Sequence, residues 1–322
     1  MARGRSLDRV AALEDRLSLF DAEAVRAALV DALPAAVPVT ALEPIPQGWG
    51  NESWKVDSAL GPLIAKIGRQ WSDVAKWRAS ARALDLARGA GVPVPELLEF
   101  VDSLEALDGR IFRVFRYIEG TTARADAPAP LFRELGATMR RLHSIEVSGF
   151  TSRLGDDGFA RWSEFLEHRW PAMIGRAERA GVDPTLIARS HDVATALAAD
   201  VDSVVRPALC HRDLYFDNVL VDEKSVLVAL LDFDVAEVWD PLVEQFKLEW
   251  FVFEPNPAAR EPFFEGYLAG DPMPPMFEHR VRLVSIVELL NHAANWQVQG
   301  QHDIAAEALD RLRVQLGLPT EH

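Results

Sequence analysis

One short stretch of the sequence carries most of the side chains that could do chemistry. It reads CHRDLYFDN over residues 210–218, and LDFD follows at 231–234. Phosphoryl transfer needs a group that orients the attacking hydroxyl, together with metal ions on hard oxygen ligands that neutralise the phosphate charge. Asp213 and Asn218 lie five residues apart, and Asp232 follows a tight hairpin that can fold back beside them. This spacing predicts a base, Asp213, and two Mg²⁺ ligands.

The same residues also have structural interpretations. A His-x-Asp followed by an Asn is a short motif that recurs by chance, and an Asp after a strand often caps a turn. The position of Asp232 at hairpin distance favours the functional interpretation. We expect His211 to hold the loop by hydrogen bonds rather than to titrate.

The first 120 residues predict a small sheet with a helix across it. Asp21 is a good N-cap, and Val25, Leu29 and Leu33 recur at helical spacing, which predicts a helix over 21–33. The pattern then changes to strands at 54–56, 63–67, 97–100 and 111–117, with a helix over 73–89.

The remainder of the chain is predicted to be mostly helical. The polar segment 120–130, rich in Ala and Pro, indicates a linker. Two short strands, 219–221 and 226–231, predict a hairpin between the two chemical segments. Helices are expected over 131–144, 159–180, 184–203, 242–253, 258–268, 278–299 and 302–316.

Composition and charge exclude several classes of protein. The 322 residues are 49% hydrophobic and 26% charged, as in globular proteins. The net charge of −15 argues against a nucleic-acid partner. Residues 1–120 hold 15 basic and 17 acidic side chains, whereas residues 121–322 hold 19 and 32, so the second part carries most of the negative charge. That excess is mild support for a cationic substrate.

Cysteine content and hydropathy indicate the cellular compartment of the protein. Cys210 is the only cysteine, which excludes an intrachain disulfide and a multi-cysteine metal site. No apolar run approaches the length of a membrane helix, and the N-terminus lacks the apolar core of a signal peptide. We therefore expect a cytoplasmic protein without a membrane partner.

The segment HRDLYFDN, the hairpin and LDFD resemble the catalytic loop and metal-binding segment of the aminoglycoside phosphotransferase and choline kinase-like family. The resemblance spans residues 41–270 and implies an α+β, bilobal protein-kinase-like fold with a small N-terminal antiparallel-sheet lobe and a larger, mainly helical C-terminal lobe. The implied domains are an N-terminal helical extension (1–40), a nucleotide-binding lobe with hinge (41–120) and a catalytic and substrate-binding lobe (121–322). It also implies that Asp213 is the catalytic base and that Asn218 and Asp232 bind Mg²⁺.

Upstream motifs fit the same resemblance. The segment QGWGNESW at 47–54 resembles the family's GxxN nucleotide loop, with an ordinary hairpin glycine as the alternative. Lys66 matches the strand lysine that grips the α- and β-phosphates, with an exposed position on an edge strand as the alternative. The implied phosphate-binding residues are therefore Gly48, Gly50, Asn51, Ser53 and Lys66.

One position departs from the family pattern. The family has a helix glutamate that pairs with the strand lysine, and here Ser80 stands where that glutamate is expected. Asp73, a shifted helix or a different arrangement would then have to hold Lys66.

Two further segments complete the resemblance. Residues 114–120 resemble the family hinge, in which the carbonyl of Arg116 and the N–H of Ile118 would hydrogen-bond a purine. The implied cofactor is ATP, with GTP as an alternative. Residues 240–244 resemble the family's DPxxD segment, in which Asp240 and Glu244 would support the catalytic loop.

The acceptor is expected between the catalytic loop and the C-terminal helices. Acidic groups there would suit a polyamine-like molecule, and tryptophans would suit a ring or a quaternary ammonium. Solvated helix faces and core tryptophans are the alternative interpretation. The candidates are Asp217, Asp234, Glu237, Glu249, Glu254, Trp250, Asn295 and Trp296.

The resemblance implies a nucleotide- and Mg²⁺-dependent O-phosphotransferase that acts on a hydroxyl of a small molecule. The motif sequences are most similar to the antibiotic-modifying branch of the family, which favours an antibiotic as acceptor, either aminoglycoside-like or another natural product. Its phosphorylation would confer resistance. The alternatives are a metabolic kinase for choline, an amino alcohol or a sugar, and a non-catalytic nucleotide-binding module, which Ser80 would support. Only five residues separate Asp234 from Asp240, too few for a protein-kinase activation segment. The sequence does not indicate an oligomeric state.

Overall fold

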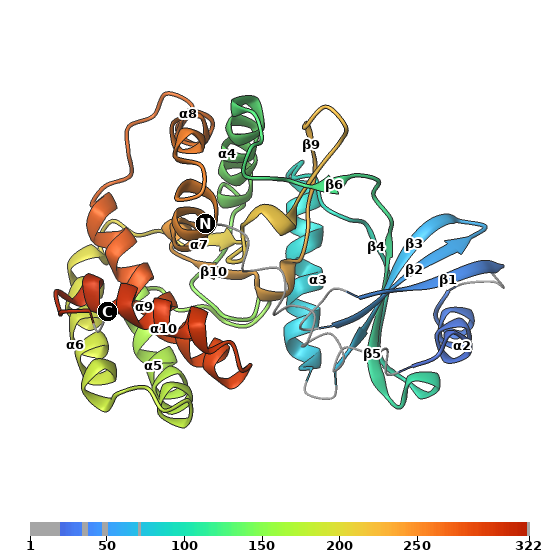
Figure 1. Cartoon of the computed structure of the whole chain (residues 1–322), viewed down its shortest axis with the longest axis horizontal. Coiled ribbons are helices and arrows are strands. Elements are labelled where there is room, and N and C mark those ends of the chain that lie inside the picture. The colour runs from blue at the N-terminus through green and yellow to red at the C-terminus, as the bar shows by residue number, and fades with distance from the viewer. Residues whose placement is uncertain (1–19, 34–37, 47–50, 70–71, 321–322) are drawn as a thin grey trace. The chain divides into compact units, whose positions relative to one another are not determined.

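A five-stranded antiparallel sheet organises the N-terminal part of the protein (Figure 1). The computed structural model describes residues 20–33, 38–46, 51–69 and 72–320. It divides the chain into two units, which we call the N-terminal unit (1–84 with 94–119) and the C-terminal unit (85–93 with 120–322).

The sheet runs in the order β1 (Val39–Ile45), β2 (Asn51–Ser58), β3 (Gly61–Gly68), β5 (Arg110–Arg116) and β4 (Leu97–Leu104). One face packs against helix α2 (Ala22–Ala32), with Trp54, Leu63 and Phe112 of the sheet in the same apolar cluster as Leu29. Because side chains alternate along a strand, the sequence neighbours of these three residues point to the other face of the sheet. Four strands lie where the sequence predicted them, and β1 is an additional strand.

Helix α2 and helix α3 (Val74–Gly89) both begin at a capping aspartate. The carboxylate of Asp21 accepts hydrogen bonds from the backbone N–H groups of Glu23 and Ala24. Asp73 does the same for Ala75 and Lys76 at the start of α3. These caps satisfy N–H groups that have no partner within a helix.

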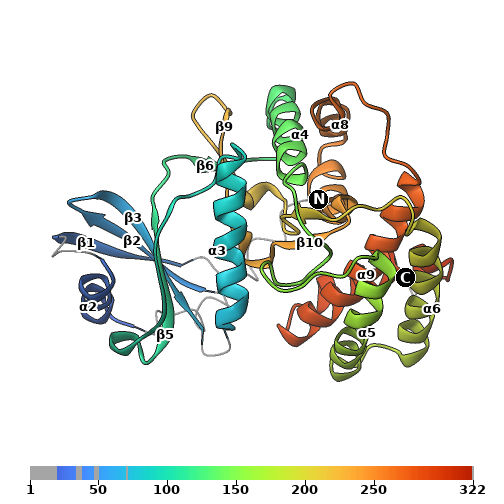
Figure 2. The same ribbon diagram turned by 180° about the vertical axis from the view of Figure 1, so that it is seen from behind.

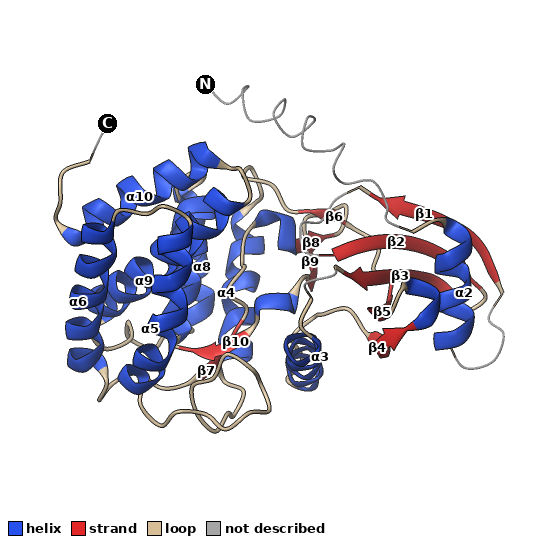
Figure 3. Ribbon diagram, turned by 90° about the horizontal axis from the view of Figure 1, so that it is seen from below, coloured by secondary structure: helices blue, strands red, loops and turns tan. Residues whose placement is uncertain are grey.

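Helices dominate the C-terminal unit. Its largest core joins α5 (Trp162–Arg179), α6 (Pro184–Val201), α9 (Phe277–Val298) and α10 (His302–Leu316), which Figure 3 shows side by side. Two more helices, α4 (Ala129–His143) and α8 (Arg260–Leu268), pack on each other. Within the described residues, no helix is long and apolar enough to cross a membrane. The predicted α+β class, a small antiparallel sheet followed by a larger helical part, is confirmed.

The short strands of the C-terminal unit correct the sequence prediction in two places. The predicted hairpin is present as β8 (Val219–Val221) and β9 (Leu227–Leu230), but β6 (Thr121–Thr122), in the predicted linker, extends it. A second pair, β7 (Ala208–Cys210) with β10 (Glu237–Trp239), was not predicted. The two pairs hold the two ends of the loop that carries Asp213, since β7 precedes that loop and β8 follows it.

The predicted helix 242–253 is interrupted. It consists of a 3₁₀ turn (Pro241–Val243), helix α7 (Glu244–Leu248) and a π-helical turn (Glu249–Phe253). Short π-helical turns inside helices are frequent at functional sites. Here the turn begins two residues after Lys247, a residue of the site described below.

Two glycines allow α4 and α8 to approach backbone to backbone (Figure 2). A Cβ on Gly136 would lie 2.0 Å from the carbonyl oxygen of Phe263, and a Cβ on Gly266 would lie 1.9 Å from that of Arg133. Backbone atoms cannot rotate away as a flexible side chain could. The two helices can therefore pack this closely only with glycine at both positions.

We expect Gly136→Ala to lower the free energy of unfolding by about 1–3 kcal/mol or more, because the added methyl group overpacks this crossing. Urea denaturation measures the change. Gly89→Ala is the matched control, since nothing lies within 4 Å of a Cβ at Gly89. Equal stability of the two variants would contradict a close crossing at Gly136.

Candidate active site

Asp213 lies on the loop between β7 and β8, and its carboxylate is held at both oxygens. The ammonium nitrogen of Lys247 is 3.1 Å from Oδ1. The side-chain amide of Asn218 donates to Oδ2 over 3.1 Å and to the Asp213 carbonyl oxygen over 2.7 Å. The structure thus brings the predicted base into contact with one predicted Mg²⁺ ligand.

The electrostatic surroundings keep Asp213 ionised. Burial alone would raise the pKa of its carboxyl group, but the ammonium of Lys247 holds the pKa below its ordinary value. A base that accepts a proton from a hydroxyl must be deprotonated at working pH. The environment of Asp213 meets that requirement.

Asp232 is brought next to Asn218 by the hairpin. Val219 pairs with Leu230, and the N–H of Leu231 donates to the Asn218 carbonyl oxygen over 2.8 Å. Asp232 itself has a φ of 65°, a left-handed conformation that Asp tolerates better than most residues. It starts the short turn Phe233–Val235 directly after the strand.

The donor groups of Asn218 and Asp232 suit Mg²⁺. Because the Asn218 nitrogen donates to Asp213, its amide oxygen is the atom available for a cation. A carboxylate and an amide oxygen are hard ligands of the type that Mg²⁺ prefers. The two residues therefore fit the ion that phosphoryl transfer requires.

His211 ties the loop to the metal-binding segment. Its Nε2 donates to the Leu231 carbonyl oxygen over 2.7 Å, and its Nδ1 accepts from the Asp213 N–H over 3.2 Å. In this tautomer both ring nitrogens are used in structural hydrogen bonds. The geometry agrees with the structural role expected for His211.

Glu244 contacts the same loop, and Asp240 caps the turn that leads into α7. The Glu244 carboxylate accepts from the backbone N–H of His211 over 2.6 Å and from that of Arg212 over 3.1 Å. Asp240 accepts from the Leu242 N–H and forms a buried ion pair with Arg280, with contacts of 2.9 and 2.7 Å. Glu244 thus contacts the catalytic loop directly, although the family pattern has the shorter Asp at this position.

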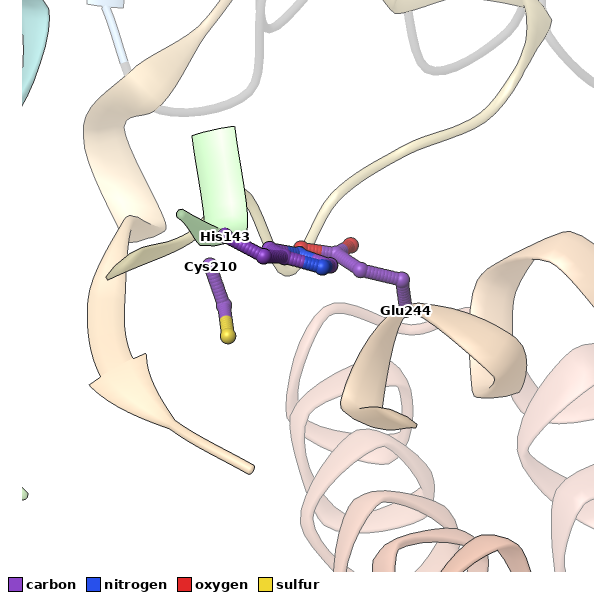
Figure 4. Close-up of side chains that lie close together, drawn as sticks. All are labelled: His143, Cys210 and Glu244. Atoms are coloured by element: carbon purple, nitrogen blue, oxygen red, sulfur yellow. The ribbon is translucent and has the colours of Figure 1, made fainter. Parts of the chain in front are cut away.

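His143, Cys210 and Glu244 form the one group of three potential metal ligands found within the described part of the chain, with ligand atoms within 4.8 Å (Figure 4). The His143 Nε2 lies 3.7 Å from Glu244, whose oxygens already accept the loop N–H groups. The Cys210 thiol faces the carbonyls of Ala208 and Asp240, and burial raises its pKa well above the ordinary value. These contacts indicate that the three residues hold the loop in place rather than bind a metal ion.

Arg212 is a further anchor that sequence reasoning missed. Its guanidinium is buried 2.6 Å from Glu237 and 2.5 Å from Glu288, and stacks 3.9 Å from the ring centre of Trp239. Glu237, which the sequence suggested as a candidate for acceptor binding, is therefore used within the protein. Arg212 also has a left-handed φ of 65°, so the loop turns sharply immediately before Asp213.

Two more of the acidic acceptor candidates form ion pairs within the protein. Glu249 pairs with Arg260, and Glu254 pairs with Arg311. Asp217 is exposed, whereas Asp234 is half-buried. The charges of Glu249 and Glu254 are thus paired within the protein, and a role of these candidates in acceptor binding stays a prediction.

The two tryptophans differ in their surroundings. Trp250 is buried, and its indole N–H donates to Glu307 over 3.1 Å. Trp296 is half-buried, and its ring centre lies 5.6 Å from the Lys247 ammonium. Trp296 thus neighbours Lys247, the residue that contacts the predicted base.

In the N-terminal unit, strand register places Ser53, Lys66 and Arg113 side by side across β2, β3 and β5. The guanidinium of Arg113 is fully buried, 3.7 Å from the ring centre of Trp77, and donates to Ser80 Oγ over 3.2 Å. The position at which the family has a glutamate is thus occupied by a serine that contacts a second cation of the sheet.

The other predicted nucleotide-binding residues are placed as follows. Asn51 begins β2 opposite Gly68. Arg116 ends β5, where its side chain pairs with Glu96 at 2.9 Å, and Ile118 lies two residues further on, half-buried. Gly48 and Gly50 lie outside the described residues.

The similarity of this chain to known proteins extends over both units. A family model described as "Phosphotransferase enzyme family" matches residues 41–278. Among the curated proteins, none matches the sequence. A solved structure of a thermostable mutant of aminoglycoside phosphotransferase APH(4)-Ia, in ternary complex with AMP-PNP and hygromycin B, is similar with a TM-score of 0.70 and 19% identity. It covers 91% of this chain and 98% of that chain.

Two other solved structures are similar in the same way. A candidate fructosamine-3-kinase from Thermobifida fusca YX-ER1 has a TM-score of 0.66 at 20% identity, covering 89% of this chain and 98% of that chain. A macrolide 2'-phosphotransferase type I has a TM-score of 0.63 at 18% identity, covering 92% and 98%. At these identities the similarities establish the fold, which is protein-kinase-like as the sequence motifs implied.

Proposed function

The chain belongs to the phosphotransferase enzyme family, and we propose that it transfers a phosphoryl group from ATP to a hydroxyl group of a small molecule. The observation that carries this proposal is the clamped carboxylate of Asp213, with Asn218 bonded to it and Asp232 at the end of the adjoining hairpin. A base and two hard oxygen ligands on one loop and one hairpin are what phosphoryl transfer requires.

In the proposed reaction Asp213 orients the acceptor hydroxyl and takes its proton as the oxygen attacks phosphorus. The nucleotide phosphates are contacted by Lys66, Asn51 and Ser53. The purine ring is contacted by the backbone of Arg116 and Ile118. Asn218 and Asp232 would hold Mg²⁺, which when bound neutralises phosphate charge. Most of the rate enhancement comes from positioning and charge stabilisation.

For the acceptor we propose a natural product of antibiotic type. Two of the similar structures are described as phosphotransferases of an aminoglycoside and of a macrolide. The fructosamine-3-kinase candidate supports a metabolic sugar-type acceptor as the second possibility. The half-buried rings of Tyr215, Phe251 and Trp296 lie around the ammonium of Lys247, which contacts Asp213.

A quaternary ammonium acceptor such as choline has less support. The aromatic faces that would bind it already surround the ammonium of Lys247, at 5.1 to 5.6 Å from the ring centres. A second cation against the same faces would meet like-charge repulsion.

A screen of acceptors tests the proposal. Purified protein with Mg²⁺ and ATP is incubated with aminoglycosides, hygromycin B, macrolides, fructosamines, sugars and choline, while ADP release and a mass gain of one phosphate are followed. We expect acceptor-dependent ADP release with at least one ring-containing alcohol. ATP binding without turnover on any acceptor or on water would instead indicate a nucleotide-binding module.

A further inference from the structure

A buried lysine contacts the predicted base. Lys247 lies in α7, is 7% exposed, and its ammonium is 3.1 Å from Oδ1 of Asp213. Three aromatic rings surround the ammonium, with centres at 5.4 Å for Tyr215, 5.1 Å for Phe251 and 5.6 Å for Trp296. We call Tyr215, Phe251 and Trp296 the aromatic cage.

The cage fixes the ammonium against the carboxylate. A buried ammonium is costly unless it is paired, and ring faces add attraction that strengthens when the cation is desolvated. Two histidines, His211 and His292, also act on the Asp213 carboxylate. Burial, followed by Lys247, lowers the pKa of His292, so at neutral pH it adds no positive charge beside Lys247.

The two oxygens of the Asp213 carboxylate are bound by different side chains. Lys247 lies at Oδ1, and the side-chain amide of Asn218 donates to Oδ2. Two contacts from opposite ends of one carboxylate restrict its rotation. The lone pairs that accept a hydroxyl proton therefore point in one direction, and orientation of a reacting group is worth orders of magnitude in rate.

We propose that Lys247 is a positioning residue for phosphoryl transfer, and that the aromatic cage exists to hold its ammonium against Asp213. This inference rests on the function proposed above. For stability alone the ion pair as a whole offers little, because replacing both partners of a buried pair by apolar groups of similar volume is often neutral or stabilising. A methionine would fill the same space and adapt to the cage.

Lys247→Met is the first test. We expect kcat to fall by about 10- to 100-fold, less than the loss expected when the base itself is removed, while KM for ATP changes little. The melting temperature is expected to fall because one partner of a buried ion pair is removed, so it is recorded to confirm that the variant stays folded at the assay temperature. The assay is ADP release with the best acceptor of the screen, or with water if no acceptor is turned over. Lys224→Met, in the exposed hairpin turn, is the matched control. Wild-type kcat in Lys247→Met, or a loss confined to KM, overturns the inference.

Chemical rescue separates positioning from packing. Lys247→Ala removes a three-carbon chain and its ammonium, so we expect n-propylammonium to restore part of kcat, while propan-1-ol of the same shape does not. Lys247→Arg should retain more activity than Lys247→Met because it keeps the charge. Equal rescue by the amine and the alcohol would show that only volume matters. The rescue assay also decides the question if Lys247→Met folds poorly.

The outcome for Asp213 separates the role of Lys247 from the proposed function. If Asp213→Ala is inactive and Lys247→Met is fully active, only the role of Lys247 fails. If Asp213→Ala itself turns over normally, the base assignment and the proposed mechanism fail together.

Discussion

Asp213→Ala is expected to abolish measurable turnover while ATP still binds. Removal of a general base typically costs about 10²- to 10⁴-fold in rate. The nucleotide contacts proposed for Lys66, Asn51 and Ser53 do not involve Asp213, so affinity for ATP should survive. Asp213→Asn refines the test because it keeps the shape of the side chain but cannot accept a proton from the hydroxyl.

Two measurements check this expectation on the same preparations. ADP release gives kcat, and isothermal titration with ATP gives the dissociation constant. Glu223→Gln, exposed in the hairpin turn, is the control for loss of one carboxylate from the C-terminal unit. Full retention of turnover in Asp213→Ala would rule out Asp213 as the base. Loss of ATP binding in both Asp213 variants would show that the carboxylate acts on the nucleotide instead.

The catalytic loop could be predicted because its information is local. Asp213, Asn218 and the hairpin lie within a short stretch, so residue types and spacing define the arrangement without knowledge of the remaining chain. The family resemblance based on that stretch is confirmed by the match over residues 41–278. The roles of individual residues stay predictions until the variants are measured.

The supports of the loop could not be predicted because their information is not local. Strands β7 and β10 are three residues long and pair Ala208 with Trp239 across 31 positions, so neither has a periodicity of its own. The cage of Lys247 combines Tyr215, Phe251 and Trp296 from three separate segments. The sequence offered one signal of the cage, which is Lys247 in the mostly apolar segment 246–253. A lysine is seldom buried in such a segment unless its charge has a partner.

The N-terminal unit shows both the reach and the limit of sequence reasoning. The motif register alone indicated that Ser80 stands where the family has a glutamate. The contact between Arg113 and Ser80 joins strand β5 to helix α3 across 33 positions, so no local pattern predicts it. Asp73 caps α3 through Oδ1, which accepts hydrogen bonds from the N–H groups of Ala75 and Lys76.

Acid should weaken the protein through the pair formed by Glu288 and Arg212. Glu288 is fully buried. Burial alone would raise its pKa, but Arg212 at 2.5 Å, together with His292, lowers the pKa to about 2 from the ordinary 4.5. Because the folded-state value is the lower one, the unfolded chain takes up the proton first as pH falls. The stabilisation is therefore complete above about pH 4.5 and disappears as pH falls towards 2.

Glu288→Gln isolates this contribution. At neutral pH the variant should lose several kcal/mol, on the order of the ~3–5 kcal/mol seen when one partner of a buried pair is removed, since Arg212 is left with Glu237. Below about pH 4.5 wild-type Glu288 contributes progressively less, so by about pH 3 the difference between the two proteins should shrink by roughly 2 kcal/mol. Urea unfolding at several pH values between neutrality and about pH 3 measures it, with Glu223→Gln as a control whose difference stays near zero. A pH-independent difference would mean that Glu288 acts through packing alone.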